Sequence, residues 1–586
     1  MNWNKKIVTA GLTAASMLTT LAGCAGIPAD YADLLNNIPV DPADPMNRIP
    51  AESAGGQSDG AETESVSKKQ DVQMEGGSYN VLFLTVDQQH YFAEDPEGTN
   101  WKARQLLAEL GTTFEKHYSC ANVSTSSRSV MFTGMHIPDT GMIDNTDFVF
   151  QDAMDDSLTT IGDMMREAGY YSALKGKWHL GDASILSDDA KLTDLEDYGY
   201  SDWGGTDYIG SLHEGHDKDP VVVSEALDWL DTTGRELNEE GRPFFLQVNL
   251  INPHDIMDYD ITGYESPNME LGGKPDDPLY DTTYDVAIPS SWDFDLTASD
   301  VPEAMRTYQT FWGMNAGVIT DPDVWQDYQN YYFNCIQDSD NNLMKILDHI
   351  QDNGLLQNTV IVFTADHGEM HGSHAVKGKG GFLYENNVHV PLIIVHPDYE
   401  GGRRISTITS HVDLAPTLVD MTGISEEKKA EITAHLAGHS LLPLMDGSAD
   451  QVRDASLFCY EMLSFTAISF GTDEEGNTTR TLNLESRGMV RGITTDQYKF
   501  VRYFSPLDFN TPKTLEELFA HNDVQLFDLS ADPEELINLA ADPEANGELI
   551  LAMNDLLNET IAREIGEDDG AEVKKALKII QDMNQK

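Results

Sequence analysis

The stretch STSSRSVMFTG, from Ser124 to Gly134, places a hydroxyl residue four positions before an arginine. Small polar residues separate the two, and an apolar turn follows them. If a helix begins near Ser126, Ser124 lies at its amino end, where free N–H groups and the helix dipole favour an anion. Arg128, about one turn further on, can then contact the same anion through its guanidinium. A serine-rich cap on a buried helix has the same local sequence, so other segments must decide between the two interpretations.

Four apolar runs elsewhere in the chain each lead into polar or charged residues. The runs cover residues 81–86, 171–174, 244–250 and 360–364, and they lack the alternation of half-buried strands, which is typical of buried parallel strands. The polar residues that follow them are Asp87 and Gln88, Lys177 and His179, His254, and Asp366 and His367. Taken singly, each would more often be a helix cap or a structural hydrogen bonder. Ligands of open α/β sheets collect beyond the carboxyl ends of strands, so we expect these side chains to meet at one edge.

Predicted helices alternate with these strands, at 102–110, 158–168, 222–237 and 335–351. Strands and helices that alternate through short links indicate an α/β fold, in which a mainly parallel sheet is sandwiched between helices. With 586 residues the chain can bury a large core of this kind. We expect this catalytic domain to occupy residues 79–450.

The pattern changes near residue 450. Short predicted strands at 489–493, 498–501 and 526–529 are followed by predicted helices at 534–541 and 547–563. Strands that come first and helices that come after them are typical of an α+β unit. We therefore expect residues 451–586 to form a smaller subdomain with a short antiparallel sheet.

The first 78 residues precede the folded body. Lys5 and Lys6 come before a short apolar stretch, and the sequence LAGC that ends at Cys24 resembles a bacterial lipobox, whose cysteine is lipidated. A plain signal peptide cleaved nearby is the alternative. Residues 25–78 are rich in Pro, Gly, Ser and acidic residues, as in a flexible linker. We expect residues 1–24 to be a lipoprotein signal peptide, and the protein to be extracytoplasmic and anchored to the membrane through Cys24 alone.

The chain is strongly acidic, with 37 Lys+Arg against 99 Asp+Glu and a formal net charge of −62 at pH 7. This charge excludes a nucleic-acid binder and argues against a basic patch for membranes. If the substrate is an anion, the lysine and arginine side chains that bind it must lie close together at the site. Beyond residue 24, the three cysteines form no Cys-x-x-Cys pair, which argues against a zinc site.

The order of the motifs resembles the type I sulfatases of the alkaline-phosphatase-like superfamily. Their signature runs Cys/Ser-x-Pro/Ala-x-Arg and continues to a turn that ends in Thr-Gly, and residues 124–134 follow it. The other matching motifs are GKWHLG from Gly176, NPHD from Asn252, DHGE from Asp366, YE from Tyr384, VPL from Val390, DLAPT from Asp413 and LFDL from Leu526. The resemblance extends from about Asn80 to Leu539, and the ordered series makes it specific.

The resemblance implies that a radical-SAM maturase oxidises Ser124 to Cα-formylglycine, whose hydrate attacks the sulfur of a sulfate ester. Arg128 would hold that hydrate, and His179 would promote the collapse that releases sulfate. Oxygen-rich ligand sets suit Ca²⁺ or Mg²⁺ better than zinc. The resemblance implies Ca²⁺, with Mg²⁺ or Mn²⁺ less favoured. Its implied ligands are Asp87, Gln88, Asp366, His367 and the modified Ser124.

Three cationic or proton-donating residues would handle the rest of the substrate. The resemblance assigns the sulfate oxygens to Lys177 and to Lys379, which lies near Tyr384. Lys377 is a nearby competitor for the second role, because Lys379 stands one position further from Tyr384 than the family pattern expects. His254 would protonate the leaving alcohol.

The sequence departs from the family pattern at three further places. Gln88 stands where an aspartate is common, and His367 stands where an asparagine is common. Both variants resemble the branch of choline-sulfatases and phosphonate monoester hydrolases, so phosphorus substrates remain an alternative. Ser126 replaces the Pro or Ala of the core that the maturase recognises.

Three functions are therefore compared. The first is hydrolysis of sulfate esters on a sulfated small molecule or glycan, with a carbohydrate or aryl alcohol as the leaving group. The second is a phosphodiesterase, phosphonate hydrolase or phosphatase of the same superfamily. The third is a surface lipoprotein that binds sulfated glycans without turnover. Residues 255–310, rich in Asp, Tyr and Pro without clear periodicity, are expected to shape the substrate site or to form a lid.

Overall fold

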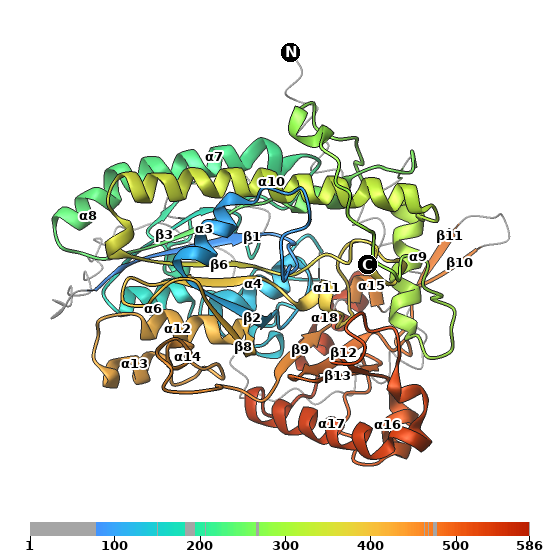
Figure 1. The fold of residues 1–586 in the computed structure, drawn as a ribbon. Coiled ribbons are helices and arrows are strands. Elements are labelled where there is room, and N and C mark those ends of the chain that lie inside the picture. The colour runs from blue at the N-terminus through green and yellow to red at the C-terminus, as the bar shows by residue number, and fades with distance from the viewer. Residues whose placement is uncertain are drawn as a thin grey trace, which may run out of the picture.

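This computed structural model contains a large mixed sheet, a smaller antiparallel sheet and a two-stranded sheet of β10 (Ile468–Thr472) and β11 (Thr478–Leu482) (Figure 1). The structure describes residues 78–148, 150–181, 194–204, 207–264, 266, 269–461, 463–466, 468–472 and 478–584. The expected signal peptide, and the expected linker up to residue 77, lie outside these ranges. Within the described ranges, no helix combines the length and the apolar character that a membrane crossing requires.

The large sheet has the strand order β4-β3-β5-β1-β6-β7-β2-β8. Its strands are β1 (Asn80–Val86), β2 (Thr112–Tyr118), β3 (Tyr171–Gly176), β4 (Asp202–Trp203), β5 (Phe244–Asn249), β6 (Thr359–Ala365), β7 (Leu392–Val395) and β8 (Arg403–Ser410). Only β7 runs antiparallel to its neighbours; all other pairs in this sheet are parallel. The predicted α/β fold with a mainly parallel sheet is confirmed.

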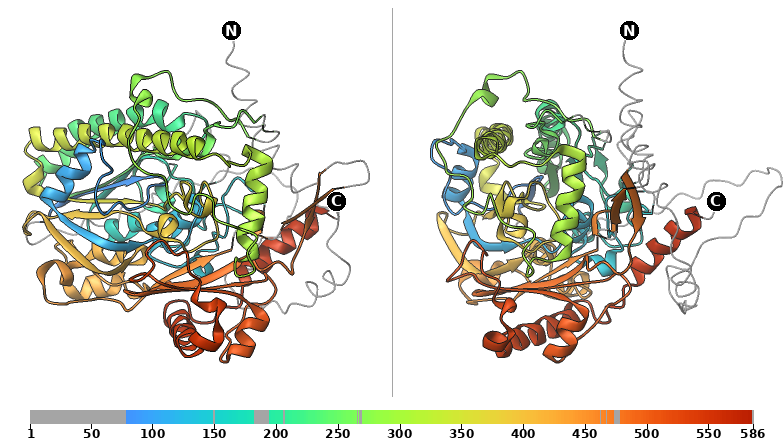
Figure 2. Two further views of the ribbon diagram at one scale, coloured as in Figure 1. Left: turned by 45° about the vertical axis from the view of Figure 1, so that its right-hand side comes forward. Right: turned by 90° about the vertical axis from the view of Figure 1, so that its right-hand side faces the viewer.

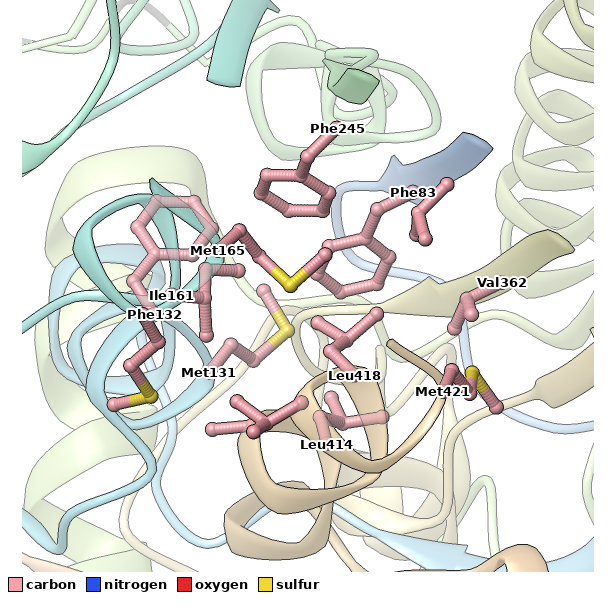
Figure 3. Packing of buried hydrophobic residues seen from close by; sticks show 14 of the residues in the cluster. Phe83, Met131, Phe132, Ile161, Met165, Phe245, Val362, Leu414, Leu418 and Met421 are labelled. Atoms are coloured by element: carbon pink, nitrogen blue, oxygen red, sulfur yellow. The ribbon is translucent and has the colours of Figure 1, made fainter. Parts of the chain in front are cut away.

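Helices cover both faces of this sheet, because its central strands are apolar on both sides. In β1, Leu82 and Leu84 pack against one helical layer, and Val81 and Phe83 pack against the other. The first layer contains α3 (Lys102–Leu110), α7 (Glu214–Trp229) and α10 (Pro322–Asp352), and the second contains α4 (Ser124–Thr133), α6 (Ile161–Glu167) and α12 (Leu414–Asp420). Figure 3 shows the second layer, in which Met131 and Leu418 lie beneath the strand residue Phe83.

Two helices of the first layer begin earlier than the sequence predicted. α10 begins at Pro322 rather than near 335. Its first half was not predicted, because it carries buried aromatic residues on several sides and shows no clear amphipathic period. α7 begins at Glu214 rather than near 222 and contains Pro220, a residue that usually marks a helix end. Both helices lie along the same face of the sheet (Figure 1).

The segment expected to be irregular from 255 to 310 is partly helical. Two short 3₁₀ turns, at His254–Asp258 and Pro278–Asp281, precede α9 (Glu303–Ala316). α9 stands between the first helical layer and the C-terminal part of the chain in each view (Figures 1 and 2). This position brings α9 residues such as Tyr308 against the segment that carries Lys379.

The C-terminal part holds an antiparallel sheet of order β14-β13-β12-β9, as predicted. Its strands are β9 (Ser456–Tyr460), β12 (Met489–Thr494), β13 (Tyr498–Phe504) and β14 (Asp523–Asp528), and its helices include α16 (Leu515–His521), α17 (Pro543–Glu564) and α18 (Ala571–Asn584). The helix predicted at 534–541 is wrong: only a 3₁₀ turn, Leu539–Ala541, forms there, after the acidic turn of Asp532–Glu535. β9 and α18 were not predicted.

A buried ion cluster joins this C-terminal part to the main sheet. Arg453 contacts Asp413, at the start of α12, through two nitrogens, and its third nitrogen lies 3.3 Å from Glu564 Oε1 at the end of α17. His136 Nε2 also lies 3.0 Å from Glu564 Oε2. Burial raises the pKa of Glu564, but His136 and Arg453 outweigh that effect and lower it to about 2.

We expect Glu564→Gln to destabilise the protein by about 3 kcal/mol at pH 7. The pKa of Glu564 is lower in the folded chain than in the unfolded one, so its contribution is present above pH 4.5 and is lost as the pH falls toward 2. Denaturant unfolding of both proteins between pH 2.5 and pH 7 measures this difference and its loss at low pH. A variant as stable as the wild type at pH 7 would contradict the prediction.

Candidate active site

The predicted meeting of polar residues at one edge of the sheet is observed. β3, β5, β1 and β6 are consecutive parallel neighbours, so their carboxyl ends lie side by side. Lys177 follows β3, Asp87 follows β1 and Asp366 follows β6 directly. His254 comes shortly after the end of β5.

Ser124 is the first residue of α4 and lies at this edge. All residues of α4 are buried, including the polar ones, and the helix begins two residues earlier than expected. The Ser124 hydroxyl lies 3.2 Å from Asp87 Oδ2, 3.3 Å from His367 Nε2 and 3.2 Å from Lys379 Nζ. The serine thus contacts residues from three distant segments, which a helix cap alone does not require.

Arg128 connects the two carboxylates of the site. Its Nη2 lies 3.0 Å from Asp87 Oδ2, and its Nε lies 3.1 Å from Asp366 Oδ2. Its Nη1 donates to the backbone carbonyl of Lys177, 3.2 Å away. Among the described residues Arg128 has no hydrogen bond with Ser124, so the two meet only through their shared partner Asp87. Arg128 therefore orients the carboxylates around the serine.

The cations determine the charge of the carboxylates. Lys177 Nζ lies 2.8 Å from Asp87 Oδ2, and both side chains are completely buried. Burial raises the pKa of Asp87, but Lys177, Lys379 and Arg128 outweigh it and hold that pKa well below its usual value. Burial and the neighbouring Asp87 raise the pKa of Asp366 to about 6. Asp87 is therefore the more firmly ionised of the two.

Three of the predicted metal ligands come close enough to share one ion. Asp87, Asp366 and His367 each offer a ligand atom, and these atoms lie within 4.8 Å of one another. His367 Nδ1 lies 3.1 Å from the carbonyl of Gly368 and donates to it, which leaves the Nε2 lone pair free for a metal. Burial lowers the pKa of His367 well below its usual value, so the ring is neutral. Two carboxylates and a neutral imidazole fit a divalent cation.

Gln88 adopts a different arrangement from the other predicted ligands. Its side-chain oxygen accepts from Lys379 Nζ at 2.9 Å, and its amide nitrogen donates to Glu369 Oε2 at 2.5 Å. Its backbone N–H donates to Asp366 Oδ1 at 3.0 Å. A metal ion that binds the Gln88 side-chain oxygen would therefore compete with Lys379 for that oxygen.

The two predicted catalytic histidines come from two segments, with His179 two residues after Lys177 and His254 after β5. His254 stands in the 3₁₀ turn after β5, and its ring packs so closely on Gly210 that a Cβ there would lie 2.2 Å from it. Burial, with the charges of Lys379 and Lys177, lowers the pKa of His254 well below its usual value. His179 Nε2 lies 3.6 Å from Asp147 Oδ2.

The structure separates the two lysines that the sequence left as competitors. Lys379 Nζ lies 3.2 Å from the Ser124 hydroxyl, and Lys377 Nζ lies 5.0 Å from the ring centre of Trp312. Burial lowers the pKa of each lysine to about 8. Lys379 is therefore the lysine placed at the serine.

Sequence reasoning gave no role to two carboxylates that support the site. Glu369 accepts hydrogen bonds from Gln88, from the Tyr328 hydroxyl at 3.0 Å and from the Gly378 N–H at 2.6 Å. Asp207 accepts from the backbone N–H of His179 at 2.8 Å. Glu369 lies two residues after His367 in the DHGE motif, so that motif could have indicated a role for Glu369 in the site. Asp207 carries no comparable signal.

The comparison with protein families agrees with this arrangement. A family profile described as Sulfatase matches residues 79–424, more than half of the chain. The chain belongs to the sulfatase family. A second profile, for the C-terminal part of N-sulphoglucosamine sulphohydrolase, matches residues 372–563 of this sulfatase. Family membership classifies the sulfatase as a sulfuric ester hydrolase of the alkaline-phosphatase-like superfamily, which confirms the predicted family.

Curated relatives match most of the folded body. The sulfatase is 26% identical over 365 residues to the uncharacterized sulfatase YidJ of Escherichia coli, and the match covers 58% of this chain and 65% of the relative, slightly under two thirds. It is 23% identical over 514 residues to an N-acetylglucosamine-6-O-sulfatase of Bacteroides thetaiotaomicron, covering 78% and 82%. It is 26% identical over 510 residues to a choline-sulfatase of Rhizobium meliloti, covering 80% and 84%.

Solved structures share the fold at low sequence identity. A 2-O GAG sulfatase superposes with a TM-score of 0.61 at 17% identity, covering 83% of this chain and 92% of that one. A phosphonate monoester hydrolase from Silicibacter pomeroyi superposes with a TM-score of 0.59 at 19% identity, covering 83% and 96%. At these identities the likeness is one of fold, and one fold serves both sulfur and phosphorus chemistry in these neighbours.

Proposed function

We propose that this sulfatase hydrolyses sulfate esters of carbohydrates or aryl alcohols, with Ser124 converted to Cα-formylglycine as its nucleophile. The observation that carries the proposal is the set of contacts of the Ser124 hydroxyl. Asp87, His367 and Lys379 all lie within 3.3 Å of it. Family membership and relatives that act on sulfate esters support the same activity.

The metal proposed for the site is Ca²⁺, held by Asp87, Gln88, Asp366, His367 and the converted Ser124. A divalent ion there would supply positive charge that polarises the sulfate group and eases ionisation of the hydrated aldehyde. An unmodified serine hydroxyl is a poor nucleophile, which is the chemical reason for the conversion. The neutral His367 ring and the ionised Asp87 carboxylate already have the protonation states that such an ion requires.

The chain's own cations have distinct roles in the proposal. Lys177 and Lys379 bind the sulfate oxygens, and both are fixed by Asp87, whose oxygens lie 2.8 and 3.6 Å from them. Arg128 holds the nucleophile's carboxylate neighbours in place. These three buried cations offset the negative charge of a sulfate in a chain that is otherwise strongly acidic.

The two histidines move protons in the proposal. His254 protonates the oxygen of the leaving alcohol, and His179 removes the proton that lets the converted residue expel sulfate. His254 is 7% exposed, and its Nδ1 has no hydrogen-bond partner among the described residues. His179 has the Asp147 carboxylate 3.6 Å from its Nε2, where a proton can be stabilised.

A phosphorus ester is the second candidate substrate. Gln88 and His367 replace two ligands that are common in sulfatases, and the site therefore holds one carboxylate less. This set of metal ligands resembles that of phosphonate monoester hydrolases, and one such enzyme shares the fold. The proposal includes two partners besides substrate: a radical-SAM maturase that oxidises Ser124, and a membrane to which Cys24 anchors the protein outside the cytoplasm.

Two measurements on protein co-expressed with a radical-SAM maturase test the proposal. Mass spectrometry of the tryptic peptide 117–128 should show a loss of two hydrogens at Ser124. Rates on 4-nitrophenyl sulfate, 4-nitrophenyl phosphate and a 4-nitrophenyl phosphonate should be highest for the sulfate. Active protein with an unmodified Ser124 would disprove the formylglycine mechanism, and a faster phosphorus ester would favour the second candidate.

A further inference from the structure

Two ionisable side chains beside the proposed active site each have a buried polar atom without a hydrogen-bond partner among the described residues. Lys377 Nζ and Asp258 Oδ2 are buried and have no hydrogen-bond partner among the described residues. The two residues are 4% and 8% exposed. A buried charged group without a partner is costly, because it has lost water and gained no replacement. A ligand that forms hydrogen bonds with both side chains would remove this cost.

The same two segments that carry catalytic residues also carry this pair. Asp258 ends the 3₁₀ turn that begins with His254. Lys377 and Lys379 flank Gly378, and the Tyr308 hydroxyl donates to the backbone carbonyls of both lysines. Asp258 and Lys377 are therefore fixed in space relative to the proposed acid and the proposed sulfate-binding lysine.

Lys377 and Asp258 belong to the slightly less buried part of the site. Asp87 and Asp366, among the proposed metal ligands, are completely buried, whereas His254 and Lys379 are 7% and 5% exposed. Lys377 and Asp258 keep a similar small exposure. A substrate whose sulfate points to the metal cluster would thus place its alcohol part toward His254 and this pair.

Aromatic rings hold the Lys377 ammonium without using its N–H groups. Its Nζ lies 5.0 Å from the ring centre of Trp312 and 5.8 Å from that of Tyr328. Tyr328 is itself fixed by its hydrogen bond to Glu369. Cation–π attraction of this kind positions an ammonium but leaves its donors unpaired. Lys377 is therefore a positioned donor, and Asp258 is a positioned acceptor.

We propose that Lys377 and Asp258 bind two neighbouring hydroxyl groups of a neutral sugar whose sulfate ester is cleaved at Ser124. This inference rests on the proposed function and names its substrate class. Lys377 would donate to one hydroxyl oxygen, and the other hydroxyl would donate to Asp258. A substrate carboxylate can only accept hydrogen bonds and an ammonium can only donate them, whereas a vicinal diol can accept from Lys377 and donate to Asp258 at once.

The protonation behaviour of the pair agrees with this proposal. Burial raises the pKa of Asp258 to about 8 and lowers that of Lys377 to about 8. Each group is thus shifted toward its neutral form, because burial outweighs the attraction between Asp258 and Lys377. Sugar hydroxyls can donate and accept, so they suit either form.

The experiment compares alcohol parts with and without a diol, using matured protein. The substrates are 4-nitrophenyl sulfate and the 3-, 4- and 6-sulfates of galactose and N-acetylglucosamine, and sulfate release is measured by ion chromatography. Lys377→Met and Asp258→Asn should each lower kcat/KM for the best sugar sulfate about 10- to 100-fold. The same variants should change kcat/KM for 4-nitrophenyl sulfate less than about threefold, because that substrate has no sugar hydroxyl for either residue to bind. Lys345→Met, an exposed lysine on α10, is the matched control.

Several results would overturn the inference. Equal losses on both substrate types would assign the pair to the sulfate chemistry or to folding, and unchanged sugar kinetics would exclude it from the substrate site. A preference for sulfated uronates that depends on Lys377 would replace the diol with a carboxylate. A wild type that releases sulfate from no ester would instead refute the proposed function.

A binding measurement separates the two proposals. Isothermal titration calorimetry with the same sugar sulfates on unconverted Ser124 protein requires no turnover. Lys377→Met and Asp258→Asn should weaken that binding about tenfold or more, and Lys345→Met should not change it. Wild-type binding that neither substitution weakens contradicts the inference even if sulfate is released.

Discussion

Replacing Ser124 by Ala is expected to lower kcat/KM for sulfate esters by about 10⁵-fold, the scale of losing a covalent nucleophile. The substitution removes the only atom of the side chain that contacts Asp87, His367 and Lys379. It adds no volume to a fully buried helix start, so the fold should persist. Sulfate release by matured protein measures the loss, and circular dichroism verifies folding.

Ser126→Ala is the matched control for this substitution. Ser126 lies in the same buried turn of α4, and its hydroxyl has no hydrogen-bond partner among the described residues. Its removal should leave stability equal or slightly higher, since an unsatisfied buried hydroxyl is lost. Alanine also matches the family pattern at this position, so conversion of Ser124 and activity should be retained. Comparable activity in Ser124→Ala and the wild type would refute the assignment of the nucleophile.

Asp87→Asn is expected to abolish metal binding and to reduce activity at least about 10³-fold. The carboxylate is completely buried among Arg128, Lys177 and Lys379. Asparagine retains the shape but removes the charge, so three buried cations would then face one carboxylate fewer. Repulsion among these cations would oppose a divalent ion at the same place.

Inductively coupled plasma mass spectrometry on dialysed protein measures the bound metal, and Ca²⁺-dependent shifts of Tm give an independent readout. The wild type should retain an ion and gain thermal stability with Ca²⁺, and the variant should do neither. Asp348→Asn, an exposed acid on α10, controls for the loss of one negative charge. A variant that still binds Ca²⁺ like the wild type would place the metal elsewhere.

Local sequence predicted the parts of the fold that carry strong periodic signals. The run at 81–86 is apolar on both faces, and it forms the central strand β1. The first half of α10 was missed, because polar residues such as Gln329 and Asn330 are buried there beside Tyr and Trp, so no apolar stripe marks the helical period. The antiparallel direction of β7 depends on its neighbours in the sheet and not on its own residues.

The site was predictable where a polar residue directly follows a strand, as Asp87 and Asp366 do. The family motif located Ser124, but its spacing left Lys379 and Lys377 unresolved. Only the fold shows that Gly378 separates two lysines with different surroundings, one at the serine and one at Trp312. Contacts between distant segments decide such roles, and a single sequence does not contain them.

The burial of α4 also sets an order of events in time. Ser124 is 1% exposed, and the residues that enclose it at the sheet edge include Asp366 and Lys379. These emerge from the ribosome only after roughly 250 further residues, which take on the order of 10–50 s to synthesise. A maturase that needs the Ser124 peptide extended has that interval to act, before the later strands close over it. Translation speed would therefore help to determine how much of the protein becomes active.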